Sequence, residues 1–434
     1  MMHSIYPVEF VISQEQEEQH IGNLLVEKNF IEQLYQEIVS THQLEAHTFG
    51  FLKGKTPRSY IEENYKTPIY EHLQEFIFFH CLINALYHEI RQAKLVLIGD
   101  PNLSKISIHN LSNPSFEFTF TKVILSARQN WKSLAFKPAE RKNYKDLDKQ
   151  VESFIKEEDL LALTVTHKGI KTGDWVCFSM ALVNNNHEAL LGSYKNILWL
   201  KIGEEDIDLD ARDIFLGKQI GDTFYNKSIF FQRYISTQLD THYIFSITIL
   251  EQVATHQFSF DQFKKHFRLR SLKEMHQKFI EVFSFRNDIS QRRETVESLL
   301  TLLSNYFSCT IPLHLIELQE KKVLKDVHLN PDYHVYKALP DFSEKIKKLA
   351  EKQLKQTIII DYIACQENIE VSNHDITSYL YLSLRPRTKE FLYFNLPDTK
   401  KHGQEQPVPL EWLKRYCLRE KTLNYILHHL AKKN

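Results

Sequence analysis

The stretch Phe49-Gly50-Phe51-Leu52-Lys53-Gly54-Lys55-Thr56-Pro57-Arg58 lies between two segments of helical periodicity in a chain of 434 residues. Its two glycines stand four positions apart and allow a tight loop with close backbone approach. Three cations and an aromatic residue surround them, and the following proline starts a helix. Such a loop is either an ordinary basic turn or a docking tip that attracts a phosphate-rich surface and inserts an aromatic ring.

The residues around this loop predict a compact α+β unit over positions 1–115. Apolar residues at helical spacing predict helices over 29–42 and about 67–91. Strict alternation over 116–123 predicts a strand with one solvated face. Residues 116–162, which end in a charged helix, are interpreted as an extended connector.

The glycines indicate where a second unit lies. Six of the 11 glycines fall between Gly169 and Gly221, and no proline occurs between Pro138 and Pro312. This stretch also carries short apolar runs rich in aromatic and β-branched residues, which is typical of strands joined by glycine turns. We therefore expect a small β-rich domain over 163–253.

Helical periodicity dominates the remainder, 254–434. The run over 343–366 begins with a plausible N-cap and favours a long helix. Four prolines then interrupt the chain before a last helix over 410–430. The predicted fold class is thus α+β multidomain.

Composition excludes several classes of protein. There are 54 Lys and Arg against 55 Asp and Glu, so a wholly basic nucleic-acid coat is excluded. Neither a P-loop nor a GxGxxG string occurs, which disfavours a nucleotide enzyme. The five cysteines form no CxxC pair and the 21 histidines no HExxH motif, so neither a metal site nor a cofactor is expected. The chain has no GxSxG elbow, no secretory signal pattern and no apolar run of the ~20 residues that a membrane span needs, and we expect a cytoplasmic protein.

The loop at 49–58 resembles the signature loop of the trigger factor family, bacterial ribosome-associated chaperones, which usually reads Gly-Phe-Arg-x-Gly-Lys-x-Pro. Gly50, Phe51, Lys53, Gly54, Lys55 and Pro57 keep the pattern, while Leu52 stands where the family has Arg. Similar segments recur in the family's order and spacing, and they lie at 171–176, 217–222, 230–239, 311–316, 350–372 and 419–427.

The resemblance implies an N-terminal α+β ribosome-docking domain, an inserted FKBP-like β-rich domain and an all-helical C-terminal chaperone domain with arms. It implies ATP-independent shielding of nascent or unfolded polypeptides at the ribosomal exit tunnel, on RNA and protein at the rim, and a homodimer in solution. The ribosome-binding residues that it implies are Phe51, Lys53, Gly54, Lys55 and Arg58.

Whether the FKBP-like domain is an active peptidyl-prolyl isomerase is left open by the sequence. The family's apolar pocket floor corresponds here to Ile207-Asp208-Leu209-Asp210-Ala211. A carboxylate on that floor opposes catalysis, because burying an unpaired charge is costly. The retained pocket residues, which are candidates for catalysis and equally for core packing, are Tyr234, Phe178 and Trp199.

Aromatic residues of the C-terminal region are candidates for client binding, with core packing as the alternative. These are Phe279, Phe283, Phe307, Tyr362, Phe391 and Tyr393. Two alternative functions remain besides the docked chaperone. One is a working peptidyl-prolyl isomerase, and the other is a ribosome-independent holdase, which Leu52 in the loop favours.

Overall fold

The structure is a computed structural model, and it describes most of the chain. The described residues are 6–15, 19–108, 114–122, 125–127, 130–140, 146–164, 169–235, 243–255, 258–286, 289–328, 331–384, 388–396 and 398–431.

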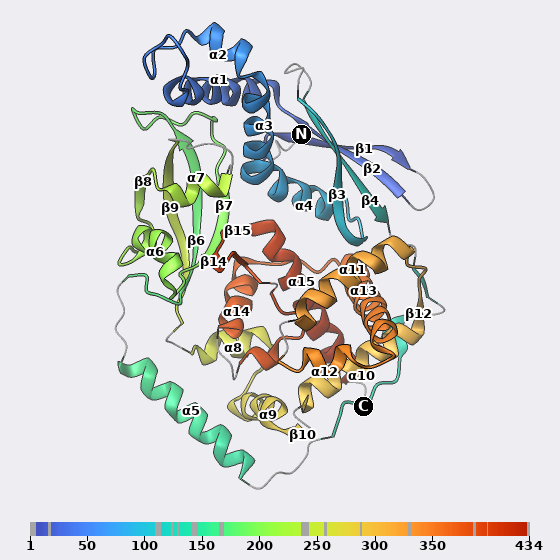
Figure 1. The fold of residues 1–434 in the computed structure, drawn as a ribbon. Helices are drawn as coiled ribbons and strands as arrows, with labels where there is room; N and C mark the ends of the chain where they lie inside the picture. Colours follow the sequence, from blue (N-terminus) through green and yellow to red (C-terminus); the bar gives the residue numbers. More distant parts are fainter. Residues whose placement is uncertain are drawn as a thin grey trace.

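The N-terminal region combines a four-stranded sheet with a group of helices (Figure 1). Its elements are β1 (Val8–Glu15), β2 (Gln19–Val26), α1 (Lys28–Glu45), α2 (Arg58–Asn64), α3 (Lys66–Ile77), η1 (Phe78–Leu82), α4 (Ile83–Gln92), β3 (Leu97–Ser107) and β4 (Ser115–Lys122). The sheet is antiparallel throughout, in the order β1-β2-β4-β3. Alternation along β4 buries Phe116, Phe118 and Phe120. The predicted second helix is present, but η1 gives it one π-helical turn in the middle.

The connector carries short elements and one long helix. They are β5 (Ser126–Ala127), η2 (Trp131–Ser133) and α5 (Leu147–Thr164). α5 lies at the lower edge of the molecule in Figure 1 and contacts the C-terminal region through Phe154, whose ring is 5.2 Å from that of Phe279.

The middle region is a sheet with short helices, as the glycine turns and apolar runs predict. Its elements are β6 (Trp175–Val183), β7 (Asn196–Lys201), η3 (Asp206–Asp208), α6 (Leu209–Phe215), β8 (Thr223–Asn226), α7 (Ile229–Ile235) and β9 (Ile244–Val253). The sheet order is β15-β7-β6-β9-β8, with all neighbours antiparallel. β15 (Val408–Pro409) comes from near the C-terminus of the chain, so the C-terminal region contributes an edge strand.

The C-terminal region is helical with a few two-residue strands. Its other elements are α8 (Phe260–His266), α9 (Leu272–Phe283), β10 (Phe285–Arg286), β11 (Ile289–Ser290), α10 (Gln291–Tyr306), β12 (Phe307–Ser308), α11 (Leu313–His328), α12 (Tyr333–Lys337), α13 (Phe342–Gln366), α14 (Asn373–Ser383), η4 (Lys389–Phe391), β13 (Lys400–Lys401), β14 (Gln404–Glu405) and α15 (Leu410–Ala431). α13 is the central helix and packs against α10, α11 and α15. α14 begins with a complete capping box between Ser372 and Asp375.

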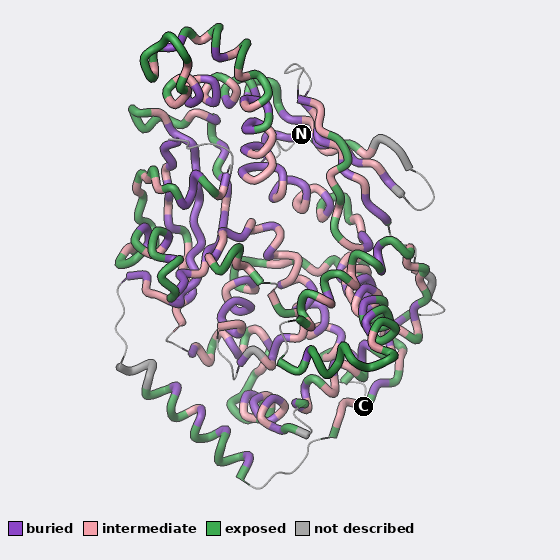
Figure 2. The backbone as a smooth tube through the Cα atoms, in the orientation of Figure 1, coloured by how far each residue is buried: buried purple, intermediate pink, exposed green. Residues whose placement is uncertain are grey.

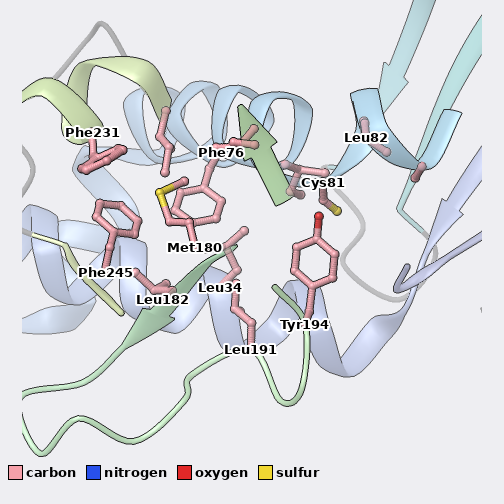
Figure 3. Close-up of a cluster of buried hydrophobic side chains, with 14 of the residues drawn as sticks. Leu34, Phe76, Cys81, Leu82, Met180, Leu182, Leu191, Tyr194, Phe231 and Phe245 are labelled. Carbon is pink, nitrogen blue, oxygen red and sulfur yellow. The ribbon is translucent and has the colours of Figure 1, made fainter. Parts of the chain in front are cut away.

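One apolar core spans the N-terminal and middle regions. Figure 3 shows Phe76 of α3 beside Met180 of the middle region, and Cys81 of η1 facing Tyr194. The opposite face of the middle region's sheet packs against the C-terminal region in a second core. Every residue of β6 is therefore buried (Figure 2).

Candidate functional site

The loop that connects α1 to α2 is held in one shape by its glycines and by hydrogen bonds to α1. Gly50 and Gly54 have φ of 87° and 77°, which side chains other than glycine rarely adopt. Gln43 Nε2 donates to the carbonyl oxygen of Thr56 at 2.6 Å, and the buried Thr56 hydroxyl donates to the Thr48 hydroxyl at 3.1 Å. The ends of the loop are thus fixed to the helix before it.

The tip of this loop presents apolar side chains to solvent. Phe49 is fully exposed and Leu52 is 80% exposed. Phe51, the predicted docking residue, is less exposed because its ring leans on Tyr60 at a centroid distance of 5.6 Å. Leu44 at the end of α1 is also exposed and lies next to Gly54 of the loop. The sequence analysis named Phe51 as a docking residue but did not name Phe49. The position of Phe49 directly before a loop glycine is the signal that could have identified it.

Two of the three predicted docking cations are engaged with carboxylates. Lys53 Nζ lies 2.7 Å from Glu45 Oε2, and Arg58 Nε lies 3.2 Å from Glu62 Oε1. Arg58 also donates to Gln36. Lys55 has no carboxylate partner within the ranges that the structure describes. Gly54 lies in the second turn of the loop, where the Lys55 N–H donates to the Leu52 carbonyl oxygen at 2.9 Å.

The three predicted pocket residues of the middle region do not share a pocket. Phe178 is buried among Phe215 and Phe231, at centroid distances of 5.1 and 5.7 Å. Trp199 lies on the opposite face of the sheet, in the core shared with the C-terminal region. The Tyr234 ring packs on Phe79 of η1 at 6.2 Å, and burial raises the pKa of its phenol above the usual value.

The π-helical turn η1 fixes the N-terminal region to this sheet. A π-helical turn leaves some carbonyl groups without their normal helical partners. The Tyr194 hydroxyl donates to the carbonyl oxygen of His80 at 2.7 Å, and Asn196 Nδ2 donates to that of Phe79 at 3.5 Å. Side chains of the middle region therefore bind carbonyl groups of this turn, and the apolar core of the middle region continues into that of the N-terminal helices.

Asp208 has a structural role rather than a place on an open pocket floor. Its carboxylate is buried, and Oδ1 accepts a hydrogen bond from the backbone N–H of Glu405 at 2.9 Å. Gln404 Nε2 donates to the carbonyl oxygen of Ile207 at 3.0 Å. The carboxylate of Asp208, which the sequence analysis placed on a pocket floor, thus binds the segment that leads into β15.

Buried histidines gather where the N-terminal helices meet the middle region. Desolvation lowers the pKa of His72 to about 3 and that of His80 to about 3, and it lowers the pKa of His42 to about 4. His72 Nε2 lies 3.0 Å from the Tyr243 hydroxyl, and the two ring nitrogens of His80 have no hydrogen-bond partner in the described part of the chain. All three are neutral near pH 7.

Three of the predicted client-binding aromatics are core residues, which corrects the expectation for them. Phe279 and Phe391 pack together in one core, and Phe307 lies in another. All three rings lie between packed helices, where their burial stabilises the fold. The remaining three, Phe283, Tyr362 and Tyr393, are partly buried at the margins of these cores.

Tyr393 also borders a cleft of about 540 Å³ between the C-terminal region and the sheet of the middle region. The cleft walls carry both cations and carboxylates, among them Arg293, Lys201 and Glu405. A mixed, polar lining of this kind does not resemble an apolar ligand pocket.

The exposed apolar residues of the C-terminal region lie mainly elsewhere, on the helical arm formed by α11, α12 and the start of α13. Those on the arm are Leu313, Leu318, Val335, Tyr336, Leu339 and Leu349. In the sequence, such residues can be recognised as apolar positions that do not belong to the buried face of their helix. On α11 the buried face is formed by Leu315, Ile316 and Val323, and Leu318 lies outside it.

Other kinds of site find no support in the described ranges. No group of three or more His, Cys, Asp or Glu among those residues is arranged to hold a metal ion. No helix within them is both long enough and apolar enough to cross a membrane.

Comparisons with known proteins agree with the loop signature. The model of the bacterial trigger factor protein family matches residues 10–157, and the model of the family's C-terminus matches residues 271–388. A solved structure, from work on promiscuous substrate recognition in the folding and assembly activities of the trigger factor chaperone, is similar over 97% of this chain and 100% of that chain, at 15% identity and a TM-score of 0.36. A search of curated proteins gives no match. The two family models together cover more than half of the sequence, and this chain belongs to the trigger factor family.

Proposed function

We propose that this protein is an ATP-independent chaperone that docks beside the ribosomal exit tunnel through the loop at 49–58 and shields emerging polypeptides. The observation that supports docking is the anchored, solvent-exposed loop at one extremity of the molecule (Figure 2). A loop whose shape is fixed before binding loses little conformational entropy when it binds. A rigid tip with exposed apolar and cationic side chains is more typical of a binding surface than of an ordinary connecting turn.

The helical arm supports client binding. Val335, Tyr336 and Leu339 are exposed around the turn between α12 and α13, and Leu313 and Leu318 are exposed on α11. Charged residues separate them along the chain. Dispersed apolar positions among polar ones favour weak and promiscuous contacts with unfolded segments, which then release without an energy source.

The middle region acts in this proposal as a structural unit and not as an isomerase. An X-Pro substrate needs an apolar pocket that is open to solvent, whereas Phe178 is buried under Phe215 and Phe231. The ring of Tyr234 packs on Phe79 of the N-terminal region. A protease-coupled assay with a short X-Pro peptide should therefore give the uncatalysed rate. A clear acceleration that disappears in Tyr234→Ala would favour the alternative function, a peptidyl-prolyl isomerase.

Docking is tested by cosedimentation of the purified protein with ribosomes. The native chain should sediment with ribosomes, and a variant with residues 49–55 replaced by a glycine–serine linker of the same length should stay in the supernatant.

Client shielding is tested in parallel by the suppression of aggregation of a chemically unfolded protein. The triple variant Val335→Ser, Tyr336→Ser, Leu339→Ser should lose suppression and still bind ribosomes. Suppression without any ribosome binding would instead establish a ribosome-independent holdase.

A further inference from the structure

We propose that α5, the helix of the connector, is a displaceable cover over a second client-binding surface on the C-terminal region, and that an amphipathic helical segment of a client takes its place. This inference rests on the proposed chaperone function and adds a covered site to the exposed helical arm. The surface is formed by the rings of Phe258, Phe279 and Phe283, which we call the aromatic groove.

α5 carries a narrow apolar stripe along one side. Leu147, Val151 and Phe154 are buried, and their spacing places them on the same side of the helix. Glu152 and Lys156 lie outside the stripe and are exposed. This is the pattern with which amphipathic helices bind apolar grooves on other proteins, where residues at i, i+4 and i+7 are the anchors.

The stripe enters the aromatic groove through Phe154. The centroid of its ring lies 5.7 Å from that of Phe258, 5.2 Å from that of Phe279 and 5.5 Å from that of Phe283. Phe258 precedes α8 and the other two rings belong to α9, along which α5 lies (Figure 1). An aromatic side chain enclosed in this way is a typical anchor of a protein interface. α5 therefore occupies the groove as a peptide ligand does, although it belongs to a different part of the chain.

A client helix with the same stripe can replace α5 because it makes the same kind of contact. The exchange replaces one set of buried apolar side chains by another, so the covered and client-bound states differ little in free energy. α5 is part of the same chain and has a high effective concentration at the groove, so only a client held near the chaperone competes with it. While no client is bound, Phe258 and Phe279 stay buried and offer no surface for aggregation.

Exposed apolar residues at both ends of α9 provide a first contact for such a client. Leu272, the first residue of this helix, is 70% exposed, and Phe285, which follows its end, is 40% exposed. Both side chains are accessible while α5 is in place. A client segment that binds at either end lies beside the helix that carries Phe279 and Phe283, and so competes directly with α5 for the aromatic groove.

The first test uses a fluorescent peptide of residues 146–160 as the probe and measures its binding to the full chain by anisotropy. Val151→Ser with Phe154→Ser removes the centre of the stripe, and this variant should bind the peptide at least about tenfold more tightly than the native chain does. Glu152→Ser with Lys156→Ser, at exposed positions of α5, is the matched control and should bind it as the native chain does. Equal binding by the native chain and the Val151 and Phe154 variant would overturn the proposal.

A closed form of the chain gives a second test that does not depend on how well the open variant folds. Asp148 Oδ1 and His276 Nδ1 are 3.9 Å apart, so Asp148→Cys with His276→Cys places two thiols where a short bismaleimide can join α5 to α9. The partly buried Cys309 and Cys365 are changed to serine in this chain. The joined chain should suppress aggregation of a chemically unfolded protein several-fold less well than the same chain left unjoined.

Hydrogen exchange of the native chain follows the cover directly. Addition of the unfolded protein should speed amide exchange over 147–160, whereas exchange over 410–431 in α15 should not change. Equal suppression by the joined and unjoined chains would overturn the cover and leave the chaperone function intact. Absence of suppression by the native chain would overturn the chaperone function itself.

Discussion

The side chains of Asn84 and Asn196 are hydrogen bonded to each other in a buried position, with 2.7 Å between Asn84 Nδ2 and Asn196 Oδ1. Asn84 belongs to α4 of the N-terminal region, and Asn196 begins β7 of the middle region. The same side chain also reaches the C-terminal region, since the backbone N–H of Glu411 donates to Asn84 Oδ1 at 2.8 Å. One amide therefore joins the three parts of the chain.

Removal of this amide should destabilise all three parts together. Asn84→Ala leaves the Glu411 N–H and the Oδ1 of Asn196 without these partners in a buried site, and each such loss costs about 1–3 kcal/mol. We expect the free energy of unfolding to fall by about 3 kcal/mol in urea titrations. Asn102→Ala, at an exposed position of β3, should change it by less than about 0.5 kcal/mol. Equal stabilities of the two variants would show that the junction contributes nothing.

The hydroxyl of Tyr194 should stabilise the same interface through the π-helical turn. It donates to the His80 carbonyl oxygen at 2.7 Å in a buried setting, and Tyr194→Phe removes this hydrogen bond. We expect a loss of about 1–2 kcal/mol, measured by chemical unfolding. Tyr225→Phe, which alters an exposed ring stacked on His187, serves as the control and should be close to neutral.

These interface contacts could not be predicted from the sequence, whereas many of the elements could. Helical periodicity predicts the helices now seen as α1, α13 and α15, and alternation predicts β4. Asn84 and Asn196 are 112 residues apart, and nothing in local periodicity relates two polar residues at that separation. The apolar spacing of α3 and α4 predicts a buried face but not that the middle region covers it.

The sequence analysis placed Trp199 in one pocket with Phe178, and the reason that this expectation differs from the structure is also physical. β7 is apolar at consecutive positions, because one of its faces lies in the core shared with the N-terminal region and the other in the core shared with the C-terminal region. Without alternation, the sequence does not reveal which residues share a face with Phe178. Strand register settles it, since Trp199 pairs with Cys177 and Leu198 pairs with Phe178.

The loop was the more predictable part of the candidate site, because its two glycines require a positive φ that the structure shows. Its electrostatics were less predictable. Lys53 is separated from Glu45 by eight positions and meets it only because the loop folds back towards the end of α1. The same folding turns Phe49 outward, whereas Phe51 is partly covered by Tyr60.

Acid should weaken the contact between the N-terminal and middle regions. His42, His72 and His80 are neutral in the folded protein, with pKa values of about 4, about 3 and about 3, against 6.5 for an exposed histidine. Above pH 6.5 they are neutral in both the folded and unfolded states and add no pH dependence. Below pH 6.5 the unfolded chain binds protons that the folded chain does not, so stability falls by about 1.4 kcal/mol per pH unit for each histidine, until the pH reaches the folded pKa.

The measurement is the free energy of unfolding in urea between pH 7 and pH 5. His80→Phe keeps the backbone carbonyl group that Tyr194 needs and keeps an aromatic ring between Phe76 and Tyr194. This variant should reduce the slope below pH 6.5 by about 1.4 kcal/mol per pH unit and leave stability above it within about 1.5 kcal/mol of the native value. An unchanged slope would mean that His80 is protonated in the folded protein.

Asp208 should hold the C-terminal edge strand on the sheet of the middle region. Its carboxylate accepts the Glu405 N–H, three residues before β15, and β15 pairs with β7 through Val408 and Pro409. Proline has no N–H to donate, so this short edge strand depends on contacts outside the ladder. Asp208→Ala should therefore raise amide hydrogen exchange over 404–408 and lower the free energy of unfolding by about 2 kcal/mol. Asp208→Asn retains the accepting oxygen and should exchange nearly as slowly as the native protein, while β9 should stay protected in both variants. Fast exchange in Asp208→Asn as well would show that the negative charge, rather than the hydrogen bond to Glu405, holds the strand.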